Sequence, residues 1–93
     1  MTTVEDEPLE NIGWTKAPTD RPYTPLDVRG LGPPAPLQRT LETLTELDTR
    51  TILIQFNDRA PQHLYPQLDD RGYSYETVET EGMTVTAIWR SDS

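Results

Sequence analysis

The chain contains no cysteine, and this absence excludes several kinds of chemistry together. Disulfides, thiolate metal sites, persulfide carriage and cysteine nucleophiles all need that sulfur. Histidine is almost absent as well, since His63 is the only one. With one histidine, few serines and no G-x-S-x-G motif, the sequence gives no support for a Ser-His-Asp catalytic triad. It also contains no G-x-G-x-x-G or Walker motif for nucleotide binding. We therefore do not expect an enzyme that acts alone.

Long hydrophobic runs and positive charge are also missing. The longest aliphatic run is the three residues 52–54, so no segment can span a membrane, and the acidic N-terminus does not read as a signal peptide. Sixteen Asp and Glu against eight Lys and Arg give a net charge of -8. This balance argues against nucleic acids and anionic membrane surfaces, which attract cationic proteins. We expect a cytoplasmic protein.

The acidity suggests a salty environment. Lys16 is the only lysine, and hydrophobic residues make up only 33% of the chain. At about 1 M salt the Debye length falls to roughly 3 Å, so repulsion between surface carboxylates is screened. The composition fits a halophile, and an ordinary acidic protein at moderate salt is the alternative. Either way the charge concerns solubility rather than catalysis.

The 93 residues allow one small domain, which we place at residues 24–91. Residues 1–23 contain scattered prolines and acidic residues without a hydrophobic period, and are expected to form a disordered acidic tail. Trp14 is the exception in this segment. It either docks on the domain or a partner, or is an exposed aromatic residue, and we favour the exposed state.

Strand and helix patterns alternate from residue 24 onward. Residues 26–29 predict a short strand, and Gly30 to Gly32 end it. Prolines then open a helix, as the first turn tolerates. Its apolar stripe has spacings of four, three and three: Leu37, Leu41, Leu44 and Leu47. The segment 51–57 contains a nearly continuous apolar stretch at residues 52–56, which is typical of a strand buried on both faces.

The second half predicts a helix and a hairpin. Residues 60–70 read as a helix with an apolar stripe at Leu64 and Leu68, in which Pro66 is expected to produce a kink. Residues 73–79 and 83–90 alternate with period two and predict an antiparallel hairpin. The second of these strands places four core residues on one face: Met83, Val85, Ala87 and Trp89.

The order of elements is therefore β-α-β-α-β-β. A right-handed crossover makes the first two strands parallel, and both helices are expected on the same face of the sheet. The predicted fold class is α/β, an α+β two-layer sandwich with a four-stranded mixed sheet and two helices on one face.

Residues 26–37 read Leu-Asp-x-x-Gly-Leu-x-x-Pro-x-Pro-Leu and resemble the TusA/SirA sulfur-carrier superfamily. Those small proteins share this order of elements and carry a cysteine just before the first proline of a Cys-Pro-x-Pro motif. Pro33 stands at that position here. The motif Asp58-x-x-Pro61 and the proline at position 66 are also similar. The resemblance spans about residues 25–90 and implies a TusA/SirA-like fold.

The sequence is also similar to the family called domain of unknown function 2249. Its motifs appear here as Leu-Asp-Val-Arg at residues 26–29, the pair Pro33-Pro34, and Asn-Asp-Arg-Ala-Pro-Gln-His-Leu-Tyr at residues 57–65. Many members carry a histidine directly after the aspartate, where this chain has Arg59, so a metal or redox role based on that histidine does not carry over. The resemblance implies an accessory role around redox or respiratory nitrogen and sulfur metabolism.

The proline at position 33 has a chemical consequence. A sulfur carrier needs a thiolate, which the N–H groups and dipole of a helix N-terminus stabilise. Pro33 supplies no sulfur, and with Pro34 and Pro36 it removes three N–H donors from that region. Persulfide transfer by this chain alone is excluded. The same loss weakens the helix start as a phosphate-binding site.

Two pairs of charged residues are candidates for a functional surface. Asp27 and Arg29 lie two apart on the first predicted strand, so their side chains share one face. They either orient an anionic ligand or dock a partner, with arginine as the bidentate group. Alternatively they have a structural role, as a local ion pair across the sheet or as a helix cap, and we favour the structural role. Asp58 and Arg59 precede the second predicted helix and complete the candidate surface with His63.

His63 has two interpretations. It can contribute to a weak metal site with Asp58, although strong sites use several ligands at defined spacing. A histidine on a helix surface is the interpretation that we favour, and we expect no metal or other cofactor. The aromatic residues Tyr65, Tyr73, Tyr75 and Trp89 form either an exposed binding face or part of the thin core. We favour the core for Trp89 and for one tyrosine.

The sequence thus predicts a small non-enzymatic accessory or interaction domain with a sulfur-carrier-like fold. Its expected partner is another protein, and we favour a monomer. Two alternatives stay open at this point. One is a docking partner in a sulfur relay, and the other is a small-ligand or metal-dependent enzyme that uses His63 and Asp58.

Overall fold

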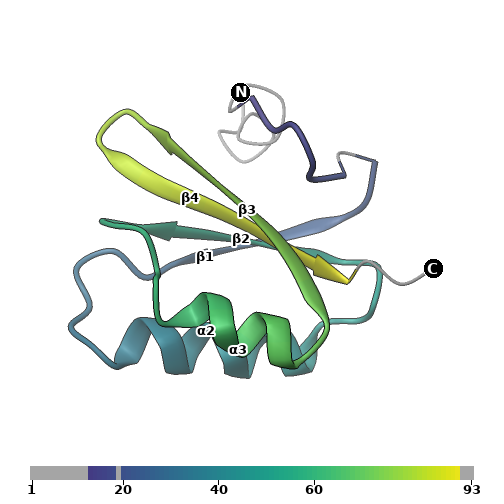
Figure 1. Ribbon diagram of the computed structural model, residues 1–93, viewed down its shortest axis with the longest axis horizontal. Coiled ribbons are helices and arrows are strands. Elements are labelled where there is room, and N and C mark those ends of the chain that lie inside the picture. The colour runs from purple at the N-terminus through teal and green to yellow at the C-terminus, as the bar shows by residue number, and fades with distance from the viewer. Residues whose placement is uncertain (1–12, 19, 91–93) are drawn as a thin grey trace, which may run out of the picture.

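The computed structural model describes residues 13–18 and 20–90, and it consists of a four-stranded sheet with two helices on one face (Figure 1). The elements in chain order are β1 (Tyr23–Asp27), α2 (Ala35–Glu46), β2 (Ile52–Asn57), α3 (Leu64–Asp70), β3 (Tyr73–Thr80) and β4 (Met83–Arg90). The strands are arranged in the order β1-β2-β4-β3. Strands β1 and β2 are parallel, and the other two pairs are antiparallel. The predicted order of elements and the mixed sheet are confirmed.

The parallel pairing of β1 and β2 decides where the candidate site lies. Tyr23 stands opposite Ile52, and Asp27 stands opposite Phe56. The carboxyl-terminal ends of both strands therefore lie at the same end of the sheet. The loop from β1 to α2 and the loop from β2 to α3 both start at this end, which brings the two sequence motifs into one region.

The helix boundaries follow from proline chemistry. Helix α2 starts after Pro34 without a side-chain cap, and it buries Thr40 and Leu44 against the sheet. Helix α3 starts at Leu64, four residues later than predicted, because the N–H of Leu64 donates to the carbonyl of Pro61 in a preceding turn. Pro66 consequently lies in the first turn of α3, where its missing N–H needs no partner. Pro66 is therefore in the first turn of the helix and not in its middle, where the predicted bounds 60–70 placed it.

The helices cover an apolar cluster on one sheet face. It consists of Leu44, Leu53, Leu64, Leu68 and Ile88. The other leucines of the predicted α2 stripe pack against it and are half-buried. The stripe of residues 37–47 is therefore confirmed as the face of α2 that meets the sheet.

A row of polar side chains crosses this same face. Gln55 is fully buried, and its amide donates to the hydroxyl of Thr40 over 2.8 Å. The Thr40 hydroxyl in turn donates to the carbonyl of Pro36 at 2.7 Å. The hydroxyls of Thr77 and Thr86 are bonded to each other at 3.0 Å. Because these buried groups have partners, they are held in one arrangement.

The opposite face of the sheet has its own apolar cluster. Its buried residues are Ile52, Ile54, Val85, Ala87 and Trp89, and Met83 packs against them. The predicted core set on β4 is thus confirmed, and it lies on the face turned away from the helices. Figure 1 shows the N-terminal stretch (purple) on this side of the sheet.

Trp14 packs on this second cluster together with Ala17, and its side chain is half-buried. The expectation of an exposed Trp14 is therefore wrong. The described part of the predicted tail, residues 13–18 and 20–23, likewise lies against the domain rather than apart from it, and β1 already begins at Tyr23. The sheet offers this segment an apolar surface and an acceptor for its N–H groups, which its own composition does not reveal. Residues 1–12, 19 and 91 of the predicted tail and domain lie outside the described residues.

Candidate functional site

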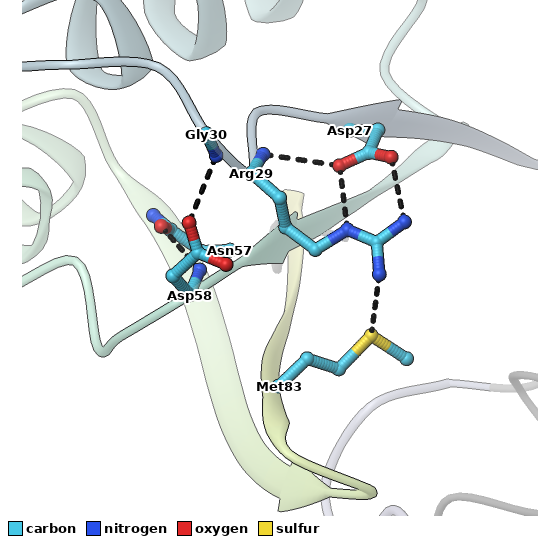
Figure 2. Close-up of polar contacts among 6 residues, drawn as sticks. All are labelled: Asp27, Arg29, Gly30, Asn57, Asp58 and Met83. Atoms are coloured by element: carbon cyan, nitrogen blue, oxygen red, sulfur yellow. Dashed lines mark hydrogen bonds and ion pairs between the residues drawn. The ribbon is translucent and has the colours of Figure 1, made fainter.

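The candidate site lies where β1 and β2 end and their two loops leave the sheet. Figure 2 shows the polar contacts among Asp27, Arg29, Gly30, Asn57, Asp58 and Met83. Sequence motifs that are almost thirty residues apart meet here through the contact of Asp58 with Gly30 (|i−j| = 28).

Asp27 and Arg29 form a bidentate ion pair. The Nη2 of Arg29 lies 2.8 Å from Oδ2 of Asp27, and its Nε donates to Oδ1 at 2.9 Å. The backbone N–H of Arg29 also donates to Oδ1, at 3.0 Å. These contacts to Arg29 hold the pKa of Asp27 below its usual value and raise the pKa of Arg29. The predicted ion pair is therefore present at the end of β1.

The guanidinium of Arg29 reaches further, to the β3–β4 hairpin. Its Nη1 donates to the sulfur of Met83 over 3.6 Å (Figure 2). The side chains of Arg29 and Asp27 are still 47% and 52% exposed. Two of the three guanidinium nitrogens are thus bonded to Asp27, and the group is held in place while it stays accessible to solvent.

Asp58 ties the two loops together. Its Oδ2 accepts the N–H of Gly30 at 2.8 Å, and its own N–H donates to Oδ1 of Asn57 at 2.7 Å. Gly30 has a φ of +82°, in the left-handed region that suits glycine. The carboxylate of Asp58 therefore fixes the turn after β1 from the start of the neighbouring loop.

The loop that is fixed in this way presents Leu31. This side chain is 39% exposed and is the one exposed large hydrophobic residue in ranges 13–18 and 20–90. Its N–H donates to the carbonyl of Val28 at 3.3 Å, and Val28 is buried in the core. The turn thus has a buried anchor at one end and an apolar tip that faces solvent. Sequence reasoning missed Leu31, although an apolar residue between two glycines is an available signal.

Arg59 and His63 do not join the ion pair. Both are exposed, and the Arg59 guanidinium has no hydrogen bond or ion pair with any part of the chain that the structure describes. His63 occupies the N-cap position of α3 without a side-chain cap. It makes no hydrogen bond to Asp58, and the described residues contain no group of three or more His, Cys, Asp or Glu side chains that could hold a metal ion.

A shallow depression borders the site beneath the β3–β4 hairpin. Its lining residues are Asp58, Glu79, Thr80, Glu81, Gly82, Met83 and Thr84. Sequence reasoning identified only Asp58 among them, because the others meet it through the pairing of β4 with β2. The depression is acidic, so it disfavours anionic ligands.

Three prolines, Pro33, Pro34 and Pro36, stand at the start of α2. Pro33 is exposed there, and the N–H of Ala35 is already bonded to the carbonyl of Gly32 at 3.0 Å. Pro34 and Pro36 have no N–H. The helix start therefore offers neither a nucleophile nor the row of free donors on which anion binding depends.

The aromatic residues belong mostly to the packing between helices and sheet. The rings of Tyr65 and Tyr75 are stacked with centroids 4.8 Å apart. The Tyr65 hydroxyl bonds Thr77, and the Tyr75 hydroxyl donates to Asp69. Partial burial and the charge of Asp69 raise the pKa of Tyr75. Trp89 is 7% exposed, so its predicted place in the core is confirmed.

Comparison with known proteins agrees with the motifs described above. A family model described as "Uncharacterized conserved protein (DUF2249)" matches residues 25–90, which run from the middle of β1 to the end of β4. No curated protein and no solved structure matches the chain. None of the helices in the described ranges is long and apolar enough to cross a membrane. Because the match covers more than half of the residues, the chain belongs to the DUF2249 family.

Proposed function

We propose that this domain is a non-catalytic interaction module that docks a partner protein at the end of the sheet where β1 and β2 terminate. Its contact surface, called here the Leu31 surface, consists of Arg29, Leu31 and Arg59. The observation that carries the proposal is the exposed Leu31 at the tip of a turn fixed by Asp58. A turn held in one conformation loses little entropy when it is bound.

The composition of the surface supports a protein partner. Arginine is enriched among the residues that contribute most of the energy in protein interfaces, and an exposed apolar side chain beside it gains from being removed from water. Arg59 brings a guanidinium without an intramolecular acceptor in the described ranges, and Arg29 brings one that its ion pair holds in place. A partner with an apolar pocket rimmed by carboxylates would fit both features. Because the whole chain carries a net charge of -8, an acidic partner would be repelled outside this region, which would restrict the contact to it.

The chemistry of the helix start supports a role without sulfur transfer. In this proposal the domain keeps a fold like that of the TusA/SirA carriers, while Pro33 occupies the place of the sulfur-bearing residue. It would act in the cytoplasm, of a halophile if the acidity reflects high salt, as an accessory to redox or respiratory metabolism. A place in a sulfur relay is a narrower form of the same proposal, in which the docked partner itself bears the cysteine.

Affinity capture with single substitutions tests the proposal. The full chain is used as bait in lysate of its source, and bound proteins are quantified for the wild type, Leu31→Ser and Arg59→Glu. We expect at least a tenfold loss of the same captured protein in both variants. Arg50→Ala is the matched control, because Arg50 is exposed in the loop before β2, at the other end of the sheet.

Two outcomes are decisive. Equal capture by the wild type and by both variants would overturn the proposed surface. A partner lost in both variants and retained by Arg50→Ala would support it. The identity of that partner then separates the two forms of the proposal, since a sulfur-relay role requires a protein with a reactive cysteine.

A further inference from the structure

Residues 13–18, called here the strap, lie on the sheet face that the helices leave open (Figure 1). Trp14 and Ala17 of the strap pack on a set of buried apolar side chains, called here the open face: Ile52, Ile54, Val85, Ala87 and Trp89. In the strap itself Gly13, Thr15 and Lys16 are exposed. The strap therefore contacts the sheet as a short peptide does, through two side chains and its backbone.

Glu76 on β3 binds the backbone of the strap. Its Oε2 accepts the N–H of Thr15 at 2.8 Å and the hydroxyl of the same residue at 2.8 Å. Its Oε1 accepts the N–H groups of Lys16 and Ala17 at 2.7 and 2.8 Å. One carboxylate thus holds three successive main-chain N–H groups with charge-assisted bonds. Any three successive residues other than proline supply the same donors.

Trp14 fits the open face imperfectly. Its indole Nε1 is buried and has no hydrogen-bond partner. A buried donor without an acceptor is unfavourable, because it has lost its hydrogen bond to water. A phenylalanine or leucine side chain would make the apolar contact without leaving such a donor. The strap is therefore an occupant that a better-matched segment can displace.

The family match supplies an independent observation. It covers residues 25–90, which include Glu76 and the whole open face, but it does not include the strap. The open face thus belongs to the matched part of the chain, and the strap that covers it does not. A contiguous apolar surface without a cover marks an interaction site.

We infer that the open face is a docking surface for an extended peptide segment of a partner protein, and that the strap occupies it as an intramolecular competitor. The partner segment carries an apolar or aromatic side chain without a buried donor. Three residues with free N–H groups follow it, and the last of them is small, as Ala17 is. Since the strap is tethered, it competes at a high effective concentration, and the partner segment binds when it fits better.

A peptide titration tests this inference on the full chain. The Trp14→Ala variant weakens the strap and leaves Trp89 as the sole tryptophan. The probe is the acetylated and amidated peptide Gly-Phe-Thr-Lys-Ala-Pro, which has no tryptophan, so Trp89 fluorescence reports binding on the open face. We expect saturable binding to the variant, and at least tenfold weaker binding to the wild type because of the intact strap.

Two matched variants in the Trp14→Ala background identify the acceptor. Glu76→Gln is expected to lower the affinity at least tenfold. Glu79→Gln is expected to leave it unchanged, because Glu79 lies on the same strand but is exposed and faces the other side of the sheet. A peptide with proline in place of lysine lacks the middle N–H donor and is expected to bind at least tenfold more weakly than the parent peptide.

The outcomes are decisive in both directions. Absence of saturable binding at millimolar peptide, or equal binding by Glu76→Gln and Glu79→Gln, would overturn the inference. If circular dichroism shows that Trp14→Ala is unfolded, Lys16→Pro replaces it, since that change removes one N–H bond to Glu76 and retains Trp14. Peptide binding is then followed by the NMR chemical shifts of Glu76 and Ala87. If these shifts do not change when the peptide is added, the inference is overturned.

Discussion

The carboxylate of Asp58 accepts the backbone N–H of Gly30 over 2.8 Å, and this bond joins the loop after β2 to the loop after β1. The first prediction concerns this contact. We expect Asp58→Ala to lower the free energy of unfolding by about 0.5–1 kcal/mol, as for a typical hydrogen bond. Asp58→Asn retains an oxygen acceptor and should lose less. Urea denaturation measures both values, and a loss in Asp58→Asn as large as in Asp58→Ala would contradict the role of the acceptor.

The second prediction concerns the backbone of Gly30. Its φ of +82° lies in the left-handed region, and a Cβ added there meets nothing within 4 Å. Gly30→Ala should therefore lower the free energy of unfolding through conformation alone, by about 1–2 kcal/mol. Gly32→Ala is the matched control, since Gly32 has open space and no positive φ. It should be neutral or slightly stabilising. Equal losses at both positions would show that the conformation of Gly30 is not the cause.

The third prediction is a pH dependence that originates at Glu76. Burial raises the pKa of Glu76, but the N–H groups of the strap lower it by more, so it lies below its ordinary value of 4.5. A carboxyl group with a lowered folded-state pKa stabilises the fold fully above the unfolded value. This contribution is lost as the pH falls below 4.5 through the folded-state pKa.

The check compares the free energy of unfolding of the wild type and Glu76→Gln from pH 7 down to pH 3. We expect the wild type to be more stable at neutral pH, and the difference to shrink below about pH 4.5 as the carboxylate becomes protonated. Glu79→Gln is the control, in which the difference should be small. A gap between wild type and Glu76→Gln that stays constant with pH would contradict the assignment.

The fourth prediction concerns the buried polar row. Gln55→Ala removes the donor to Thr40 and leaves a cavity between helix and sheet. We expect a loss of about 2–4 kcal/mol in the free energy of unfolding. Gln38→Ala on the exposed side of α2 should change it by less than about 0.5 kcal/mol. A loss at Gln55 no larger than at Gln38 would show that the polar row adds nothing to stability.

Hydrophobic periodicity was sufficient to predict the order of elements and the β3–β4 hairpin, and the crossover rule added the parallel β1–β2 pair. The pairing of β2 with β4 was not predicted. The leucine stripe of α2 and the alternation along β4 both appear in the structure as packed faces. The start of α3 was misplaced because a turn around Pro61 and a helix first turn have the same composition. The burial of Gln55 agrees with the predicted buried strand, but its hydrogen bond to Thr40 could not be predicted, since the two residues are fifteen positions apart in the sequence.

The candidate site was predictable only in part, for the same reason. The spacing of Asp27 and Arg29 predicts their ion pair because the two residues share one face of a strand. The bond from Asp58 to Gly30 spans two loops and depends on β1 and β2 being parallel. The strap lies about sixty residues from Glu76 along the chain, as for Lys16 (|i−j| = 60), so no local pattern indicates that they meet.

The strand order places β1 at one lateral edge of the sheet, where a further strand could be added. The N–H of Val28 points toward β2 and donates to the carbonyl of Phe56. Because successive N–H groups alternate in direction, the backbone nitrogen of Pro25 points away from β2, toward solvent. A proline nitrogen has no hydrogen to donate there. The edge thus lacks a donor in the middle of β1, which disfavours the addition of a fifth strand and so counteracts edge-to-edge aggregation.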